Sequence, residues 1–477
     1  MLAIALESAE WTLVQRLMEA GEMPNLGALA ERSAKLTVAP QRYIGGVPLW
    51  PSFTSGLEPE EHRRLYGPWL WDPHQMRVAP QQFEPLMPLW SRAGAGSVGL
   101  FDMPGVPETS AAAAFIIRGW GSHNPMEREY TVFPSDAASL LAERHPFRCG
   151  TEINYVSGDR VAELSRVGTD AIRGLRLRGA AAVRLLRRLR PEVAMIDFPE
   201  FHRSGHWLWH TLEPGDPLYE SIPDAARSLP VGIADVYREA DRQVGLLVEE
   251  AGPDAEVFVF SLNGMEPAHG IPDFLRSVLL GTGYARIAKL RTRSLPGRGF
   301  RWVKARTPAR VKRAYHGAAS EKLLLRAAQL LPDYDWAATR AFAIPSEQHG
   351  WIRLNVEGRE VAGIVPAGEY DATCEGIEAM LRSLVSAAGE PLVKQVVRTG
   401  KDNVLPDLAV HWTPAAHGEV ARLDGREFRA PRILPWLVGQ HTVEGFCLAP
   451  ERVAEERRTV APAELQELML APVGVAA

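Results

Sequence analysis

Two histidines spaced by one helical turn are the residues of this sequence best placed to bind a metal ion together. His202 and His206 follow the apolar run 193–198, which is typical of a buried strand, and His210 comes four residues later. Residues four positions apart share a face of a helix, so the two imidazoles could hold one ion. The alternative is a hydrogen-bonded pair of histidines near the edge of a sheet.

A hydroxyl and a carboxylate are the next candidates for chemistry. Thr54 and Ser55 precede Gly56 in or at the start of an expected helix, where backbone N–H groups would stabilise an anion beside a nucleophile. Glu7 follows the apolar run 2–6, and ligands of open α/β sheets gather at the carboxyl ends of the strands. The ordinary alternatives are helix caps for the hydroxyls and a capping or surface carboxylate for Glu7, which could also act as a general base.

The elements that must position these residues alternate between strands and helices. We expect strands at 2–6, 97–101, 193–198, 256–260 and 407–412, and helices at 11–20, 161–190, 234–250 and 370–388. This alternation predicts an α/β fold with a doubly wound, mostly parallel sheet. The pattern weakens at 266–340, which is rich in Pro, Gly and Arg. We therefore expect an α/β core made of residues 1–265 and 341–477, with 266–340 inserted as a cap.

The composition is that of an ordinary globular protein. Its 477 residues carry a net charge of −5, which argues against nucleic acid as the main partner. The Arg-rich segment 173–190 alternates Arg with Leu at helical spacing, which predicts an amphipathic helix. The 3 cysteines are far apart and predict neither a disulfide framework nor a Cys-zinc site. Without a membrane-length apolar run or a secretory leader, we expect a cytoplasmic protein with no membrane contact.

Several short motifs, in their order along the chain, resemble one known group of enzymes. The motifs are Met23–Leu26, Trp50–Gly56 with Pro59 and His62, His202–His206 with Trp209, Ser261–Met265, Asn355–Glu360, Pro406–Asp407, and Gly439–His441 with Gly445. Together they resemble the alkaline phosphatase superfamily, in its type I phosphodiesterase/nucleotide pyrophosphatase branch, over most of the chain. The resemblance implies an alkaline phosphatase-like fold and an enzyme with two metal ions, usually zinc, around a Ser or Thr nucleophile.

The resemblance also assigns roles to individual residues. Ser55 matches the nucleophile, and His206 and His441 match two ligands of the first metal site. His202 stands where the family has Asp, so the first site would consist of three neutral imidazoles with a fourth position open. Three imidazoles are a sound set of ligands for zinc.

The second metal site of the family is altered in this sequence. Glu7 matches one of its Asp ligands, and Leu262–Asn263 replaces an Asp-His pair. Leucine offers no ligand atom, and an amide oxygen is a weak one. We therefore expect one ion, with zinc favoured and iron, manganese or another divalent metal as alternatives; three imidazoles also suit iron, copper or nickel.

The expected function is metal-dependent hydrolysis of a small anionic ester of the phosphate, sulfate or phosphonate type, so the expected partner is a small-molecule substrate. Further candidates for a second ion or for substrate binding are Asn263, Thr54, Arg203, His269 and His349. With one ion, Ser55 loses much of its activation. Two alternatives stay open: another reaction class on the same scaffold (lyase, transferase or metal-dependent redox), and a non-catalytic binding protein.

Overall fold

The computed structural model describes most of the chain. The residues described are 1–40, 45–46, 48–65, 69–80, 85–121, 130–141, 143–146, 160–212, 224–268, 274–288, 334–344, 346, 349–402, 405–417, 420–429, 438–454 and 458–471. In this part of the chain, none of the helices combines the length and the apolar character needed to cross a membrane.

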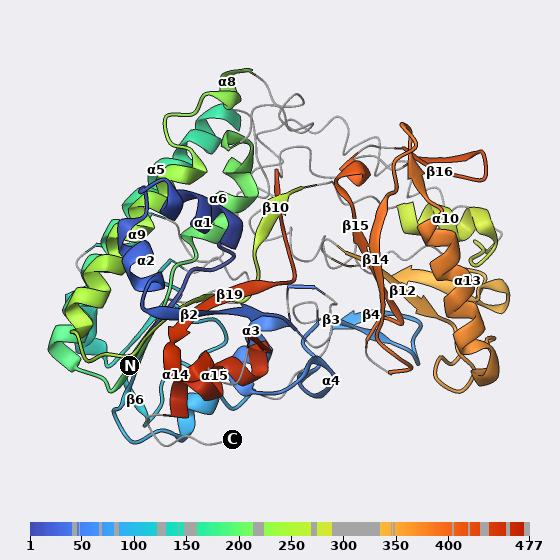
Figure 1. Cartoon of the computed structure of the whole chain (residues 1–477). Coiled ribbons are helices and arrows are strands. Elements are labelled where there is room, and N and C mark those ends of the chain that lie inside the picture. The colour runs from blue at the N-terminus through green and yellow to red at the C-terminus, as the bar shows by residue number, and fades with distance from the viewer. Residues whose placement is uncertain are drawn as a thin grey trace, which may run out of the picture.

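A nine-stranded sheet forms the centre of the larger of two bodies (Figure 1). From edge to edge its strands are β20 (Thr459–Val460), β2 (Ser33–Val38), β19 (Gly445–Pro450), β9 (Val257–Ser261), β1 (Leu2–Ala5), β8 (Val193–Asp197), β5 (Val98–Phe101), β6 (Ala113–Arg118) and β7 (Thr131–Phe133). The five strands from β9 to β6 are parallel, whereas β19 and β7 are antiparallel to their neighbours. The predicted α/β fold with a mostly parallel sheet is confirmed.

Helices cover both faces of this sheet, and strand β1 shows why. Leu2 and Ile4 belong to one apolar cluster, whereas Ala3 and Ala5 belong to another. Successive side chains of a strand point to opposite faces, so a strand covered on both sides is apolar throughout. The first cluster includes residues of α1 (Trp11–Glu19), α2 (Pro24–Ala30), α5 (Arg160–Leu189), α6 (Glu200–Leu208) and α9 (Ile233–Ala251). The second includes residues of α3 (Leu49–Ser55), η1 (Leu89–Arg92), α14 (Glu451–Ala454) and α15 (Pro462–Leu470).

The smaller body is built on antiparallel sheets and has its own apolar core. Its main sheet has the order β11 (Ala341–Ile344), β12 (Gly350–Leu354), β15 (Leu408–Trp412) and β14 (Val393–Arg398). A second sheet joins β13 (Val385–Ser386), β16 (Val420–Leu423) and β17 (Arg426–Arg429), and β3 (Trp69–Asp72) forms a hairpin with β4 (Arg77–Pro80). Helices α10 (Phe274–Thr282) and α13 (Tyr370–Arg382) contribute residues to the core of this body.

The predicted domain boundaries differ from the way the strands are grouped into sheets. We expected residues 341–477 to belong to the α/β core. Strands β19 and β20 of this range do join the main sheet, whereas the described strands from β11 to β17 pair with one another in the smaller body. Short antiparallel strands beside a helix give the same local alternation as parallel β/α units, so the sequence pattern does not specify the sheet. Within the predicted cap, 269–273 and 289–333 lie outside the described residues.

A two-stranded ladder lies between the two bodies in Figure 1. It pairs β10 (Met265–Pro267), which follows β9, with β18 (Gly439–His441), which precedes β19. The remaining short elements are α4 (Pro59–His62), η2 (Ser135–Leu140), η4 (Trp209–Thr211), α8 (Asp224–Arg227), η5 (Trp336–Ala338), η6 (Ala367–Glu369) and η7 (Pro414–His417).

Candidate metal centre

Helix α6 presents two imidazoles at the carboxyl end of the parallel sheet. Strand β8 ends at Asp197, the chain turns at Pro199, and α6 begins at Glu200. The predicted helical turn is present, with His202 and His206 on one face and their Nε2 atoms 3.1 Å apart.

A buried ion cluster holds the first residue of α6. Glu200 accepts a hydrogen bond from Arg178 Nε at 3.1 Å and lies 2.7 Å from His145 Nε2. The same guanidinium donates to Asp102 at 2.8 Å, and all four side chains are buried. A buried charge is stable only when it is paired, so this cluster fixes where α6 starts relative to β8 and β5.

Strand β18 brings a third imidazole to the pair. His441 ends β18, opposite Met265 on β10, and its ring centroid lies 4.4 Å from that of His202 and 4.6 Å from that of His206. One ring nitrogen from each of the three histidines lies within 4.8 Å of the others. The structure therefore assembles the three residues expected to form the first site, although the third is more than two hundred positions away in sequence.

The surroundings of the Nδ1 atoms of His202 and His206 indicate which nitrogen of each ring carries the hydrogen. His206 Nδ1 lies 2.8 Å from the Gly439 carbonyl oxygen, which only accepts, so Nδ1 carries the hydrogen. His202 Nδ1 lies 3.6 Å from a carboxylate oxygen of Glu7 and 3.3 Å from Ser8 Oγ, which favours a hydrogen there too. Both Nε2 atoms then present lone pairs to one another at 3.1 Å. Two such lone pairs repel unless a cation lies between them, so the residues present fit a metal ion.

Two residues expected at a second ion's position, Glu7 and Asn263, form hydrogen bonds with other protein groups. Glu7, which is buried, accepts a hydrogen bond from Trp50 Nε1 at 3.2 Å. Ser8 Oγ donates to Asn263 Oδ1 at 3.1 Å, and Leu262 belongs to the apolar core. Among the described residues, the three histidines are the one group of His, Cys, Asp or Glu with the geometry to hold a metal ion.

Ser8 and Asp197 belong to this region, and our sequence analysis missed both. Ser8 adopts a φ of 63°, a left-handed conformation that a residue of this type rarely takes and that sequence periodicity does not reveal. Asp197 pairs with Ala5 in the parallel ladder, close to Glu7. Burial, and then the charge of Glu7, raise the pKa of Asp197 well above its ordinary value. In the sequence, Asp197 stands out only as an acidic residue within the apolar run 193–198.

The hydroxyls of Thr54 and Ser55 both form hydrogen bonds with backbone groups. Ser55 ends α3 rather than beginning a helix, and its Oγ donates to the Pro51 carbonyl at 2.7 Å and accepts from Leu57 N–H at 3.2 Å. Thr54 Oγ1 donates to the Pro104 carbonyl at 3.3 Å. The helix N-terminus expected to stabilise an anion beside Ser55 is therefore not there.

Gly46 lies where a side chain from this segment would meet the histidines. A Cβ atom placed on Gly46 would be 3.2 Å from Asn263 Nδ2 and 4.0 Å from His441 Cδ2. Because the residue is glycine, it places no side chain in the space beside the amide of Asn263 and the ring of His441.

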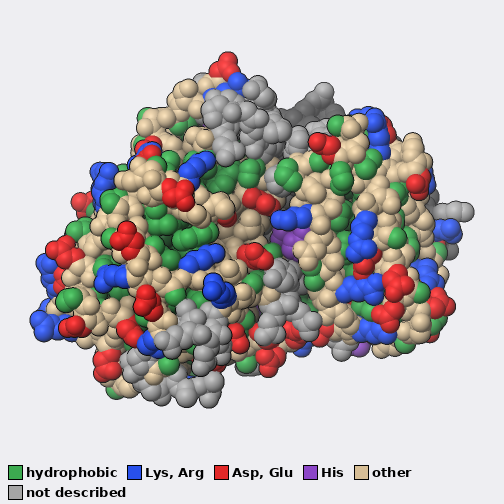
Figure 2. All heavy atoms as spheres, in the orientation of Figure 1, with side chains coloured by type: hydrophobic (Ala, Val, Ile, Leu, Met, Phe, Trp, Pro, Cys, Tyr) green, Lys and Arg blue, Asp and Glu red, His purple; other side chains and the backbone are tan. Residues whose placement is uncertain are grey.

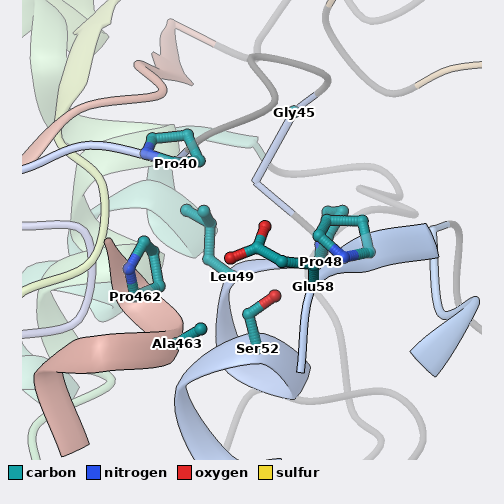
Figure 3. Close-up of a pocket in the computed structure, with 9 residues that line it drawn as sticks. Pro40, Gly45, Pro48, Leu49, Ser52, Glu58, Pro462 and Ala463 are labelled. Carbon is teal, nitrogen blue, oxygen red and sulfur yellow. The ribbon is translucent and has the colours of Figure 1, made fainter. Parts of the chain in front are cut away.

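Ser52 and His62 form a second hydroxyl–imidazole pair, 3.0 Å apart. The Arg64 N–H donates to His62 Nδ1, so His62 Nε2 carries the hydrogen and donates to Ser52 Oγ. Burial, and then the charge of Arg64, lower the pKa of His62 to about 4. The adjoining cavity, which Ser52 and Glu58 line in Figure 3, measures about 10 Å³ and holds no more than a water. This pair is not an activated nucleophile.

The remaining candidates are not part of the group of three histidines, or they lie beyond the described residues. Arg203 is buried on α6, and His210 is buried in η4. His269 lies outside the described residues. His349 is buried in the smaller body, with its ring centroid 4.1 Å from that of His411 on β15.

Comparisons with known proteins agree with this architecture. The sequence model of the type I phosphodiesterase/nucleotide pyrophosphatase family matches residues 1–409. Phosphonoacetate hydrolase from Sinorhizobium meliloti 1021, in complex with phosphonoacetate, is similar in structure, with a TM-score of 0.51, 14% identity, and coverage of 100% of this chain and 95% of that chain. Its complex with phosphonoformate gives a TM-score of 0.50 at the same identity and coverage. Murine ectonucleotide pyrophosphatase/phosphodiesterase 5 gives 0.43 at 11% identity, with coverage of 100% and 95%. No curated protein matches the sequence.

Proposed function

Because the chain belongs to the type I phosphodiesterase/nucleotide pyrophosphatase family, we propose that it hydrolyses a small phosphate-, phosphonate- or sulfate-type ester with one divalent metal ion. The ion would be held by His202, His206 and His441, and zinc is the first choice. The family is one of metal-dependent phosphoester hydrolases, so the proposal concerns the ion, its ligands and the substrate class.

The observation that carries the proposal is the approach of two Nε2 atoms to 3.1 Å, with the outer nitrogen of each ring next to an acceptor. A carbonyl or carboxylate behind a ligating imidazole fixes its tautomer and makes it a better donor to a metal. Gly439 and Glu7 occupy these places for His206 and His202. Three imidazoles leave a fourth position of a tetrahedral zinc open.

One ion is favoured over two because the neighbouring groups already bond to each other. Asn263 Oδ1 accepts a hydrogen bond from the Ser8 hydroxyl, and Glu7 Oε1 accepts one from the indole N–H of Trp50. A second ion would have to displace the Ser8 hydroxyl from the Asn263 amide oxygen, and it would gain only a weak amide ligand in return.

The chain's own groups then have separate tasks in the reaction. A divalent ion in the three-His site supplies positive charge that stabilises the negative oxygens of the reacting ester. Glu7 and Gly439 orient the imidazoles, and the Asn263 amide N–H faces the space beside Gly46, where it can donate to an oxygen of the substrate. Since Ser55 bonds to its own helix, the attacking group in this proposal is a water.

Metal stoichiometry tests the proposal directly. We expect chelator-treated protein, reloaded with Zn²⁺ and desalted, to retain about one equivalent by elemental analysis. It should hydrolyse bis(p-nitrophenyl) phosphate, p-nitrophenyl phosphate, p-nitrophenyl sulfate or a phosphonate monoester in a chelator-sensitive way. Reloading with Fe²⁺ or Mn²⁺ compares the other candidate metals. Two tightly held equivalents would contradict the one-ion proposal, and protein that binds no metal would contradict the hydrolase proposal.

A Ser55→Ala variant tests whether water or an enzyme hydroxyl attacks. We expect kcat/KM within about threefold of wild type and a loss of stability of about 1 kcal/mol, from two lost hydrogen bonds. Ser91→Ala is a matched control, because Ser91 Oγ donates to the Pro88 carbonyl in the same manner at 2.6 Å. A loss of activity beyond about a hundredfold in Ser55→Ala alone, with zinc retained, would restore Ser55 as the nucleophile.

A further inference from the structure

Two histidines form a cross-strand pair at one end of the antiparallel sheet in the smaller body. Gly350 on β12 pairs with Val410 on β15, so the next positions, His349 and His411, lie opposite one another. Their ring centroids are 4.1 Å apart with 34° between the planes, and both residues are buried. Directly opposed residues of antiparallel strands are close neighbours, which explains the contact.

A lysine completes the cluster from the adjacent strand. Strand β14 pairs with β15 on its other side, with Val393 opposite Trp412 and Gln395 opposite His411. Lys394 is the extra residue of this irregularity in the ladder, and such bulges redirect a side chain. The charge of Lys394 acts both on His349 and on Glu266 of β10. Three neighbouring strands thus bring two imidazoles and one ammonium to the same end of the sheet.

This cluster faces the three-histidine centre across two consecutive glycines. A Cβ on Gly45 would lie 3.9 Å from His349 Cδ2, and a Cβ on Gly46 would lie 4.0 Å from His441 Cδ2. Because adjacent Cα atoms are 3.8 Å apart, the rings of His349 and His441 are at most about 15 Å apart. Figure 2 shows histidine in the hollow between the two bodies, with basic and acidic side chains beside it.

The chemistry of the cluster favours an anion over a metal ion. His349 Nε2 is buried and has no hydrogen-bond partner among the described residues, although the residue as a whole is 8% exposed. Burial, and then His411 and Lys394, lower the pKa of His349 to about 3, so its ring is neutral near pH 7. A metal ion would be repelled by the Lys394 ammonium, whereas an oxyanion would gain that charge and an imidazole N–H donor.

We propose that His349, His411 and Lys394 bind a second anionic group of the substrate, a carboxylate or a phosphate, while its reacting group lies at the three-histidine centre. This inference rests on the proposed function, because it places the reacting end at that centre. The substrate class is thereby narrowed to molecules with two anionic groups separated by a short linker.

A set of matched phosphonates tests the subsite. Binding of propylphosphonate, 3-phosphonopropionate and propane-1,3-bisphosphonate to the zinc-loaded full chain is measured by calorimetry. We expect at least one of the two doubly anionic probes to bind about tenfold more tightly than propylphosphonate, and the tighter of the two identifies carboxylate or phosphate as the preferred group. In Lys394→Met and in His349→Asn this preference should fall to about twofold or less, with zinc content and propylphosphonate affinity unchanged.

The controls separate the subsite from the proposed function. Lys401→Met removes a lysine that donates to the Ala367 carbonyl, and it should keep the tenfold preference. Equal binding of all three probes to wild type, or a preference that survives in both cluster variants, overturns the subsite and leaves the proposed function standing. If propylphosphonate does not bind the zinc-loaded chain, the proposed function fails and the subsite fails with it.

Discussion

A His202→Ala variant should lose tight zinc binding and nearly all hydrolytic activity. Removal of one of three imidazoles leaves His206 and His441 with two open positions, and the lone pair that faces His206 Nε2 at 3.1 Å is gone. We expect zinc affinity and kcat/KM each to fall by about a thousandfold or more, the latter equal to about 4 kcal/mol of transition-state stabilisation. Elemental analysis after desalting and steady-state kinetics measure the two effects.

Two further variants show whether this loss is specific. His74→Ala removes an exposed histidine of the smaller body's hairpin and should leave metal content and activity unchanged. His202→Asp restores the residue type that the resemblance predicts at this position, and it should retain about one equivalent of zinc with weaker binding. If His202→Ala kept full zinc content and activity, the three-imidazole centre would be refuted.

The histidine centre could be predicted from sequence because two different kinds of information agreed. The spacing of His202 and His206 depends on local helix geometry, which is visible in the sequence. The addition of His441 depends on the pairing of β18 with β10, which is tertiary structure, and the motif resemblance supplied it. The family assignment made from those motifs is confirmed by the match over residues 1–409.

The features that the sequence did not predict are contacts that leave no pattern in the neighbouring residues of the chain. Ser8 reaches Asn263 and His202 only because its backbone takes a left-handed conformation. His411 meets His349 only through the register of two antiparallel strands. The motif resemblance matches Ser55 to the nucleophile but does not predict that its Oγ bonds to the Pro51 carbonyl and to the Leu57 N–H at the end of α3. Composition and periodicity specify elements, whereas these contacts depend on which elements pair.

A Gly439→Ala variant should damage the metal centre without removing any ligand. A Cβ on Gly439 would lie 2.0 Å from the Gly205 carbonyl oxygen of α6, and a backbone atom cannot move aside as a flexible side chain can. Strand β18 must therefore shift from α6, which displaces both His441 and the carbonyl that accepts from His206 Nδ1. We expect a loss of about 2 to 3 kcal/mol in the free energy of unfolding, measured with urea. Zinc affinity should fall by about tenfold to a hundredfold.

Gly27→Ala provides the matched control for this effect. Gly27 lies in α2, and a Cβ there would have no heavy atom within 4 Å, so this variant should be as stable as wild type or slightly more stable. Circular dichroism establishes that both variants are folded before zinc is titrated. A folded Gly439→Ala protein with wild-type zinc affinity would show that the Gly439 carbonyl and the contact of β18 with α6 do not set the geometry of the imidazoles. Weakened zinc binding in Gly439→Ala alone would show that this contact aligns residues distant in sequence into one metal site.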